Sequence, residues 1–318
     1  MKLLLTDAAT VVHENDLPLN VFERFGEVVS YDVISRAELL REVADTEAIF
    51  CNKTVIDRAV MEAAPKLKYI GLFATGYNNI DIDCARERQI TVCNAGSYST
   101  DAVAQQVFAY LLSFYTRVDE YTRFVRSGGW VTAKVFSAFG LPTDELAGKT
   151  IGIFGYGSIG QTVEKIARAF SMRPIVCTRT VRENGSTEFV SFEELLRQSD
   201  VLTVHCPLTE QTKLLFSKEV FDHMKTGAFF VNTSRGGVLD ESALAEALKS
   251  GKLSGAGIDV LTEEPMRADC VLKDVPNLLV TPHTAWAPLS TRKRLLSVVT
   301  ENFTAFLNGA PQNAVTGG

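Results

Sequence analysis

The sequence predicts an α/β protein with two doubly wound parallel-sheet domains. Short apolar runs alternate with helical patterns over residues 1–95, and the alternation resumes after residue 149. A long apolar helix pattern separates the two stretches. A chain of 318 residues, of which 46% are hydrophobic and 22% charged, is long enough to form two such cores.

The first stretch contains runs that end in turn residues and are predicted as strands: "KLLLTDA", "VVSYDV", "EAIFCN", "LKYIGLFAT" and "ITVCNA". The segments predicted as helices lie between them: "LPLNVFERFG", "RAELLREVAD", "DRAVMEAAP" and "IDCARERQ". Strands that alternate with helices at this spacing predict a parallel sheet with helices on both faces.

Residues 99–130 are predicted to form one long helix, with Ser99 or Thr100 as its N-cap. Apolar residues cover most of its surface outside one stripe, which contains Ala102, Gln106, Ala109, Tyr110 and Ser113. Because such a helix has no face suited to water, we expect it to pack against another domain or a second subunit.

The second stretch predicts the other sheet. Its expected strands are "TIGIFGYG", "PIVCT", "VLTVHCP", "AFFVNTS", "SGAGIDVL" and "NLLVTPH". Its expected helices are "QTVEKIARAFSM", "SFEELLRQ", "SKEVFDHMK" and "DESALAEALKSG". A final helix, "STRKRLLSVVTENFTAFLNG", is expected to cross back to the first domain. The predicted domains are therefore residues 1–98 with 288–318, and residues 99–287.

Composition argues against several classes of protein. The 32 basic and 38 acidic residues give a net charge of −6 without a block of like charge, which disfavours a nucleic-acid partner. The six cysteines form no C-x-x-C pair, and no clustered His, Cys and Asp spacing supports a metal site. The N-terminus does not resemble a signal peptide, and no apolar run reaches membrane-spanning length. We therefore expect a cytoplasmic protein with no membrane partner.

The stretch "GYGSIG" fits the pattern G-x-G-x-x-G. By itself the pattern also fits an ordinary glycine-containing turn, but here it follows an apolar strand and opens an amphipathic helix. In that context its glycines permit a tight turn, close approach of a pyrophosphate and close helix–strand packing, and the helix N-terminus faces the phosphates. The sequence therefore predicts a dinucleotide site. The residues expected there are Gly155, Tyr156, Gly157, Ser158, Ile159 and Gly160.

The end of the next predicted strand bears on which dinucleotide binds. An NAD site would place an acidic residue there for the ribose hydroxyls, whereas this chain has Thr178 followed by Arg179. Arginine with neighbouring hydroxyls suits a 2′-phosphate, so we expect NAD or NADP to bind, with NADP favoured. The alternative is that Arg179 is a solvated strand-end residue and that NAD binds without its usual acid.

Polar residues follow three strands at the edge where α/β sheets build their sites. They are Arg235 in "VNTSRGGVLDE", Asp259 and Glu264 in "GIDVLTEEP", and His283 in "VTPHTAW". Arginine can hold a carboxylate, and histidine can protonate a ketone oxygen while a neighbouring carboxylate favours the charged imidazole. Each residue alone also fits a structural or surface role, but together beside a nicotinamide they would suit reduction of a 2-keto acid.

The segments "GYGSIG", "VNTSRGGVLDESALAEALKSGKLSGAGIDVLTEEP" and "TPHTAW" resemble the D-isomer-specific 2-hydroxyacid dehydrogenase family, over essentially the whole chain. The resemblance implies a flavodoxin-like substrate domain and a Rossmann dinucleotide-binding domain. It implies that Arg235 grips the substrate, that His283 is the acid/base and that Glu264 pairs with His283. Asp259 would meet the nicotinamide carboxamide.

The same resemblance extends to other segments. "GLFATGYNNID" is similar to the family's substrate loop, which implies that Thr75 and Gly76 offer N–H groups to the substrate carboxylate. The long helix resembles the family's dimer helix, which implies a homodimer through residues 100–126. Further expected cofactor contacts are Thr100, His205, Cys206, Pro207, Thr212 and Thr233.

Within the family, "CNKTVID", "LFATGYNNID", "DAVAQQVFA" and "TPHTAWAP" look most like glycerate dehydrogenases, also called hydroxypyruvate reductases. Lys53 would then place a cation near a small polar substrate, or be a solvated lysine at a strand end. The resulting hypothesis is NAD(P)H-dependent reduction of hydroxypyruvate to D-glycerate. The alternatives are glyoxylate or another 2-keto acid as substrate, and, in a different class, a nucleotide-sensing corepressor-like binding protein.

Overall fold

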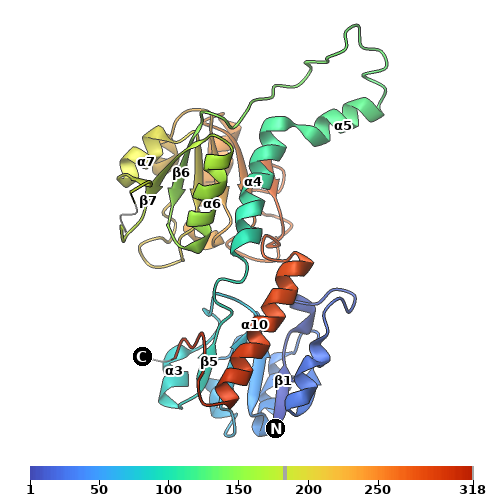
Figure 1. The fold of residues 1–318 in the computed structure, drawn as a ribbon, viewed down its shortest axis with the longest axis vertical. Coiled ribbons are helices and arrows are strands. Elements are labelled where there is room, and N and C mark those ends of the chain that lie inside the picture. The colour runs from blue at the N-terminus through green and yellow to red at the C-terminus, as the bar shows by residue number, and fades with distance from the viewer. Residues whose placement is uncertain (182–184, 317–318) are drawn as a thin grey trace. The chain divides into compact units, whose positions relative to one another are not determined.

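The computed structural model describes residues 1–181 and 185–316. The chain forms two compact units: unit 1 comprises Met1–Ser99 and Trp286–Gly318, and unit 2 comprises Thr100–Ala285. Each unit contains one parallel β-sheet flanked by helices (Figure 1). The predicted α/β class with two doubly wound sheets is therefore confirmed.

Unit 1 has a five-stranded sheet in the order β2-β1-β3-β4-β5, which is the flavodoxin-like order. The strands are β1 Lys2–Leu5, β2 Glu27–Ser30, β3 Ala48–Cys51, β4 Tyr69–Leu72 and β5 Thr91–Cys93. The α-helices are α1 Arg36–Glu42, α2 Arg58–Glu62, α3 Ile82–Glu87 and α10 Leu289–Leu307. Short 3₁₀ helices are η1 Ala8–Thr10, η2 Leu19–Phe25 and η3 Val43–Asp45, so the helix predicted at "LPLNVFERFG" is present but is 3₁₀.

The two faces of this sheet bury alternate residues of each strand, as the pleat requires. Leu4 and Ile49 belong to the core on one face, whereas Leu5 and Phe50 belong to the core on the other. Helix α10 covers the second face with Leu295, Val299 and Phe303. The last helix of the chain is thus part of the unit formed by the first residues.

Unit 2 has a seven-stranded sheet in the order β12-β11-β10-β9-β6-β7-β8. The strands are β6 Thr150–Phe154, β7 Arg173–Cys177, β8 Glu188–Phe189, β9 Val201–Val204, β10 Ala228–Asn232, β11 Leu253–Ile258 and β12 Leu278–Val280. The helices are α4 Thr100–Thr116, α5 Val118–Arg126, α6 Ser158–Ala169, α7 Phe192–Gln198, α8 Lys218–His223, α9 Glu241–Lys249 and the 3₁₀ helix η4 Gly236–Val238. The first six strands from β6 to β11 follow the Rossmann order, with β12 added beyond β11. The two-residue strand β8 was not predicted.

Helix starts follow the expected capping chemistry. Helices α1 and α7 begin with capping boxes, in which Ser35 pairs with Glu38 and Ser191 pairs with Glu194. In each, the serine hydroxyl accepts from the backbone three residues later, and the glutamate accepts from the serine N–H. These capping residues, which can be recognised in the sequence, determine where α1 and α7 begin.

The single long helix predicted over residues 99–130 is wrong. Two helices, α4 and α5, meet at Arg117, whose backbone is left-handed (φ 53°). Helix α5 ends at Arg126, and the stretch from there to β6 contains neither helix nor strand (Figure 1). The Arg117 side chain stabilises the break, because it pairs with Glu120 and stacks over Phe114.

Helix α4 owes its apolar surface to packing inside its own unit. Ala104, Val107 and Leu111 are fully buried with strand residues Ile151 and Ile153. The described chain contains no helix with the length and hydropathy that a membrane crossing requires.

Candidate active site

The glycine loop connects β6 to α6 as the sequence predicted. Gly155 has a left-handed backbone (φ 96°), and a Cβ there would lie 2.6 Å from the carbonyl oxygen of His205. Glycine is therefore required for the turn to pass this close to the chain after β9. Helix α6 begins at Ser158, directly after the loop, with Gly157 as its N-cap residue.

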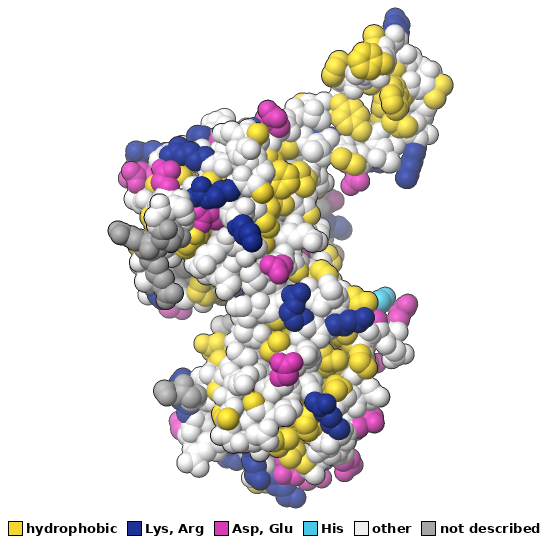
Figure 2. All heavy atoms as spheres, in the orientation of Figure 1, with side chains coloured by type: hydrophobic (Ala, Val, Ile, Leu, Met, Phe, Trp, Pro, Cys, Tyr) yellow, Lys and Arg dark blue, Asp and Glu magenta, His cyan; other side chains and the backbone are white. Residues whose placement is uncertain are grey.

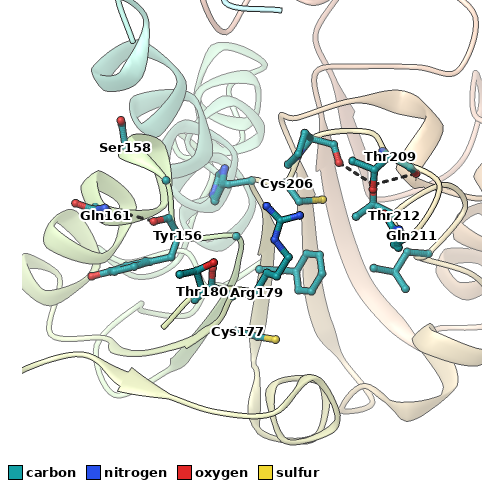
Figure 3. A pocket seen from close by; sticks show the side chains of 17 residues that line it. Tyr156, Ser158, Gln161, Cys177, Arg179, Thr180, Cys206, Thr209, Gln211 and Thr212 are labelled. Carbon is teal, nitrogen blue, oxygen red and sulfur yellow. Dashed lines mark hydrogen bonds between the residues drawn. The ribbon is translucent and has the colours of Figure 1, made fainter. Parts of the chain in front are cut away.

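A cavity of about 1130 Å³ lies at the carboxyl ends of β6, β7 and β9 (Figure 3). The predicted cofactor residues that line it are Gly155, Tyr156, Gly157, Ser158, Thr178, Arg179, His205, Cys206, Pro207 and Thr212. The lining residues that sequence reasoning missed are Phe154, Gln161, Cys177, Thr180, Thr209, Gln211 and Leu215. A cleft of this size above a glycine loop is suited to a dinucleotide.

The end of β7 gives this cavity its charge. Arg179 is exposed, and its guanidinium points into the cavity toward Cys206 (Figure 3). Thr178 and Thr180 flank it with hydroxyl groups. Among the described lining residues there is no aspartate or glutamate, so this wall offers a cation and hydroxyls to a ligand.

The remaining ionisable groups of the wall are uncharged at neutral pH. Burial lowers the pKa of His205 to about 3, so its imidazole is neutral. Its Nε2 is 2.9 Å from the Thr203 hydroxyl, whereas Nδ1 is buried with no partner among the described residues. Burial raises the pKa of the Cys206 thiol to about 11 and also raises that of Cys177, so both remain protonated. Arg179 therefore sets the electrostatic character of the cavity.

The buried carboxylate of Glu164 holds the glycine loop in place through Tyr156. The Tyr156 side chain turns away from the cavity (Figure 3), and its hydroxyl donates to Glu164 of α6. Thr187 and Arg168 also donate to Glu164, at 3.0 and 2.6 Å. Burial would raise the pKa of Glu164, but the hydrogen bonds from Tyr156, Arg168 and Thr187 outweigh it and lower the pKa. These hydrogen bonds connect Tyr156 of the glycine loop, through Glu164, to Thr187, the residue before β8.

The predicted catalytic residues lie at the carboxyl edge of three neighbouring strands. Arg235 follows β10, Asp259 directly follows β11, and His283 follows β12. These strands are adjacent and parallel, with Asn232 opposite Ile258 in the register. The three side chains thus come from consecutive connections on one edge, as the sequence predicted.

The His283 imidazole contacts the carboxylate of Glu264 at hydrogen-bond distance. The imidazole Nδ1 is 2.6 Å from a carboxylate oxygen of Glu264, and the other oxygen of Glu264 accepts from the Leu261 N–H at 2.9 Å. The side chains of His283 and Glu264 are 25% and 33% exposed, so a ligand can reach them. Nδ1 is engaged, which leaves Nε2 as the nitrogen that can face a reacting molecule.

Asp259 holds the turn that carries His283. Its buried carboxylate accepts from the Thr281 hydroxyl at 2.5 Å and from the N–H groups of Thr284 and Ala285, both at 2.9 Å. The His283 N–H donates to the Asp259 carbonyl at 2.8 Å. The sequence indicated only a cofactor contact for Asp259. In the structure, both of its carboxylate oxygens accept hydrogen bonds from residues of the chain itself.

Arg235 lies on a loop that passes close to the loop of Glu264. A Cβ at Gly236 would be 1.9 Å from the backbone of Leu261, so only glycine permits this approach. The half-buried Arg235 donates from one guanidinium nitrogen to the Ser234 carbonyl at 2.7 Å. Its other N–H groups remain available for a carboxylate.

The predicted substrate residues of unit 1 lie on two loops. The loop of Lys53 is held by the buried Asp7, whose carboxylate accepts from the N–H groups of Asn52, Lys53 and Thr54 at 2.8, 2.6 and 2.8 Å. Sequence reasoning missed Asp7. Its signal was a carboxylate directly after the first strand, "LLLTD".

The second loop carries Thr75 and Gly76. The Asn94 amide donates to the Thr75 carbonyl at 2.7 Å, and the Thr75 hydroxyl donates to the Gly96 carbonyl at 2.5 Å. The N–H groups of Thr75 and Gly76 donate no hydrogen bond to another described residue. These two groups are therefore available for an anion.

Some predicted cofactor residues do not line the cavity. Thr100 begins α4, Ile159 and Gly160 lie in the first turn of α6, and Thr233 follows β10. The buried Thr233 hydroxyl has no partner among the described residues, and it directly precedes Ser234 and Arg235. Thr233 follows β10 and His205 follows the neighbouring strand β9, so these two unpartnered groups fit a bound molecule that offers polar groups to this part of the strand edge.

Comparisons with known proteins agree with this geometry. Residues 108–285 match the family model "D-isomer specific 2-hydroxyacid dehydrogenase, NAD binding domain". The chain is 37% identical to the hydroxypyruvate reductase of Blautia hydrogenotrophica, over 99% of both chains. It is 39% identical to the glyoxylate reductase of Thermococcus litoralis, over 88% of this chain and 86% of the relative.

The similarity to known proteins also holds for the fold, as a solved structure of a relative shows. The NADPH-dependent glyoxylate/hydroxypyruvate reductase of Sinorhizobium meliloti, in complex with NADP and malonate, superposes with a TM-score of 0.85. It is 28% identical, and the match covers 99% of this chain and 96% of that one. Together with the glycine loop and the His283–Glu264 pair, these matches show that the chain belongs to the D-isomer specific 2-hydroxyacid dehydrogenase family and is an NAD(P)-dependent oxidoreductase of 2-hydroxy and 2-keto acids.

Proposed function

We propose that this enzyme reduces hydroxypyruvate to D-glycerate with NADPH as the hydride donor. The observation that carries the proposal is the His283–Glu264 pair, 2.6 Å apart on the strand edge that also bears Arg235. The name of the Blautia relative supports the substrate. The exposed Arg179 in a cavity wall without described carboxylates supports the cofactor.

The residues divide the reaction between binding and proton transfer. The dinucleotide, when bound, supplies the hydride for the keto carbon. Arg235 holds the substrate carboxylate through its planar fork, which fixes the distance and orientation of the carbonyl. The Nε2 of His283 gives its proton to the carbonyl oxygen, which becomes the hydroxyl of the product. Glu264 accepts from Nδ1, so it holds the imidazole in place and leaves Nε2 to face the substrate.

We also propose that unit 1 contributes to substrate binding. The N–H groups of Thr75 and Gly76, which have no partner among the described residues, suit a carboxylate, and Lys53 supplies a cation. Replacement of Lys53 by methionine should raise the KM for hydroxypyruvate without changing the Kd of NADPH. Lys68→Met, a change at an exposed lysine outside these loops, is the matched control.

A panel of 2-keto acids tests the choice of substrate. Hydroxypyruvate, glyoxylate, pyruvate and 2-ketobutyrate are assayed with NADPH and with NADH, and hydroxypyruvate should give the highest kcat/KM. A higher kcat/KM with glyoxylate would reject the proposed substrate and favour the activity named for the Thermococcus relative.

The cofactor preference has its own test. Arg179→Ala should raise the KM for NADPH about tenfold or more, because a charge-assisted hydrogen bond to phosphate contributes about 1.5–3 kcal/mol, and should leave the KM for NADH unchanged. Arg173→Ala, at the start of β7 and paired with Glu188 outside the cavity, is the control. A wild-type preference for NADH would overturn the NADPH proposal.

We further propose a homodimer formed through α5 and the segment after it. Val131, Phe136 and Phe139 are 87%, 90% and 90% exposed. Figure 2 shows hydrophobic side chains gathered over this part of unit 2. Side chains of this size are rarely left in water, and a second copy of the chain would bury them.

The six unpaired cysteines support a reducing compartment such as the cytoplasm.

A further inference from the structure

Tyr110 of helix α4 contacts the catalytic turn through its hydroxyl group. This hydroxyl is 2.9 Å from the carbonyl oxygen of Ile258, the last residue of β11, and it also contacts the hydroxyl of Thr281. Thr281 in turn donates to the carboxylate of Asp259 at 2.5 Å. Tyr110 thus joins the residue before Asp259 to the residue that opens the turn of His283.

Burial makes these hydrogen bonds strong and keeps water from replacing them. Tyr110 and Asp259 are 3% and 2% exposed. Away from water, a hydroxyl that bridges two polar groups holds them more firmly than the same contact on a surface would. Burial also raises the pKa of Tyr110 to about 12, so the phenol keeps its proton throughout the neutral range.

The turn needs such support, because the backbone of His283 is left-handed (φ 55°). A residue with a Cβ adopts this conformation at an energetic cost, and keeps it only where its surroundings determine it. The N–H of His283 donates to the carbonyl oxygens of Asp259 and Thr281 at 2.8 and 3.0 Å. Both of these residues belong to the chain of contacts that begins at Tyr110.

We propose that Tyr110 is a positioning residue for catalysis, which orients the His283 imidazole through Thr281 and Asp259. The inference rests on the proposed role of His283 as the proton donor. It adds a requirement that the proposed function does not contain, namely that a residue of α4, 173 positions earlier in the chain, sets the rate of the proton-transfer step.

The test removes one hydroxyl group at a time. Tyr110→Phe should lower kcat about tenfold or more, because a small misplacement of a catalytic group is costly, and leave the Kd of NADPH and the KM of the keto acid within twofold. Tyr115→Phe is the matched control, since this buried tyrosine of the same helix makes no hydrogen bond to the turn. A Tyr110→Phe enzyme whose kcat stays within twofold of the wild-type value refutes the inference.

A second pair of variants covers the case in which Tyr110→Phe does not fold. Thr281→Val should lower kcat as Tyr110→Phe does, whereas Thr281→Ser, which keeps the hydroxyl, should restore most of it. Equal kcat values for the valine and serine variants would also refute the inference.

A measurement without substrate separates this inference from the proposed function. The ¹⁵N chemical shifts of the His283 ring, recorded on the protein without ligands, should change in Tyr110→Phe and not in Tyr115→Phe. If the wild-type enzyme reduces no keto acid of the panel while these shifts change, the proposed function fails and the positioning contact stands. If the enzyme is active and the shifts do not change, only the positioning role fails.

Discussion

At the scale of single residues, the catalytic edge depends on two unusual backbone features. His283 has a left-handed conformation, and Gly236 lets the loop of Arg235 touch the backbone of Leu261. Both features bring polar side chains from separate connections to one place. Both features lie in the connections that carry the predicted catalytic side chains, so they contribute to the position of those side chains.

Arg235→Ala should lower kcat/KM for hydroxypyruvate by well over tenfold, which corresponds to more than about 1.4 kcal/mol of transition-state binding. The substrate carboxylate loses its forked partner, so both its affinity and its orientation suffer. Steady-state kinetics measure the loss, and Arg267→Ala, which changes an exposed arginine paired with Asp269, is the control. Retention of kcat/KM within tenfold would contradict the assigned role.

His205 should make the protein sensitive to mild acid. Its pKa falls from 6.5 to about 3 on folding because the ring is buried. Between these pH values the unfolded chain binds a proton there that the folded chain does not, so the free energy of unfolding falls as pH falls, by at most about 1.4 kcal/mol per pH unit. Urea unfolding of His205→Gln from pH 7 to pH 4 should show a shallower dependence than the wild type. Equal slopes would contradict this assignment.

At the scale of elements, patterns in the sequence correctly predicted those helices, strands and turns that interactions between nearby residues determine. The strand, glycine loop and helix over residues 150–169 follow from an apolar run, a glycine motif and an amphipathic repeat. The break at Arg117 could not be predicted, because no glycine or proline marks it. The contacts of Arg117 with Phe114 and Glu120, each three residues away, are of a kind that also occurs within continuous helices, so they do not signal a break in the sequence.

The same distinction applies to the site. His283, Glu264 and Arg235 could be predicted because each lies in a polar segment that follows a strand. Cys177 could have been found by the same rule, since it ends β7. Thr209 and Gln211 could not, because they reach the cavity through an irregular stretch after β9. Tyr110 lies on a helix whose pattern indicated only packing.

The network under the glycine loop gives a prediction about α6. Glu164→Ala should lower the free energy of unfolding by about 1–3 kcal/mol, because donors that are now buried against the carboxylate lose their acceptor. Tyr156→Phe removes one donor and leaves the carboxylate bonded to Thr187 and Arg168, so it should cost less. Urea unfolding measures both. A Glu164→Ala protein as stable as the wild type would show that the network does not contribute.

At the scale of the whole molecule, the exposed apolar segment after α5 predicts a dimer. Light scattering of the wild-type protein should give twice the chain mass of 34.9 kDa. The double variant Phe136→Ser, Phe139→Ser should shift the equilibrium toward monomer, since two side chains that are each 90% exposed in one chain would lose their apolar contacts with the partner. Val33→Ser, a change at a 68% exposed residue of unit 1, is the control. A wild-type monomer would end this proposal.

The return of α10 to unit 1 has a consequence for synthesis on the ribosome. Residues 1–99 emerge first, yet the side chains that cover one face of their sheet, Leu295 and Phe303 among them, are translated last. Until then Phe50 and Tyr69 lack their contacts with Phe303 of α10, while the residues of unit 2 have all been translated. Unit 1, whose first residues are translated before unit 2, therefore completes its folding after unit 2. Until α10 is made, its nascent chain exposes an apolar sheet face that chaperones can bind.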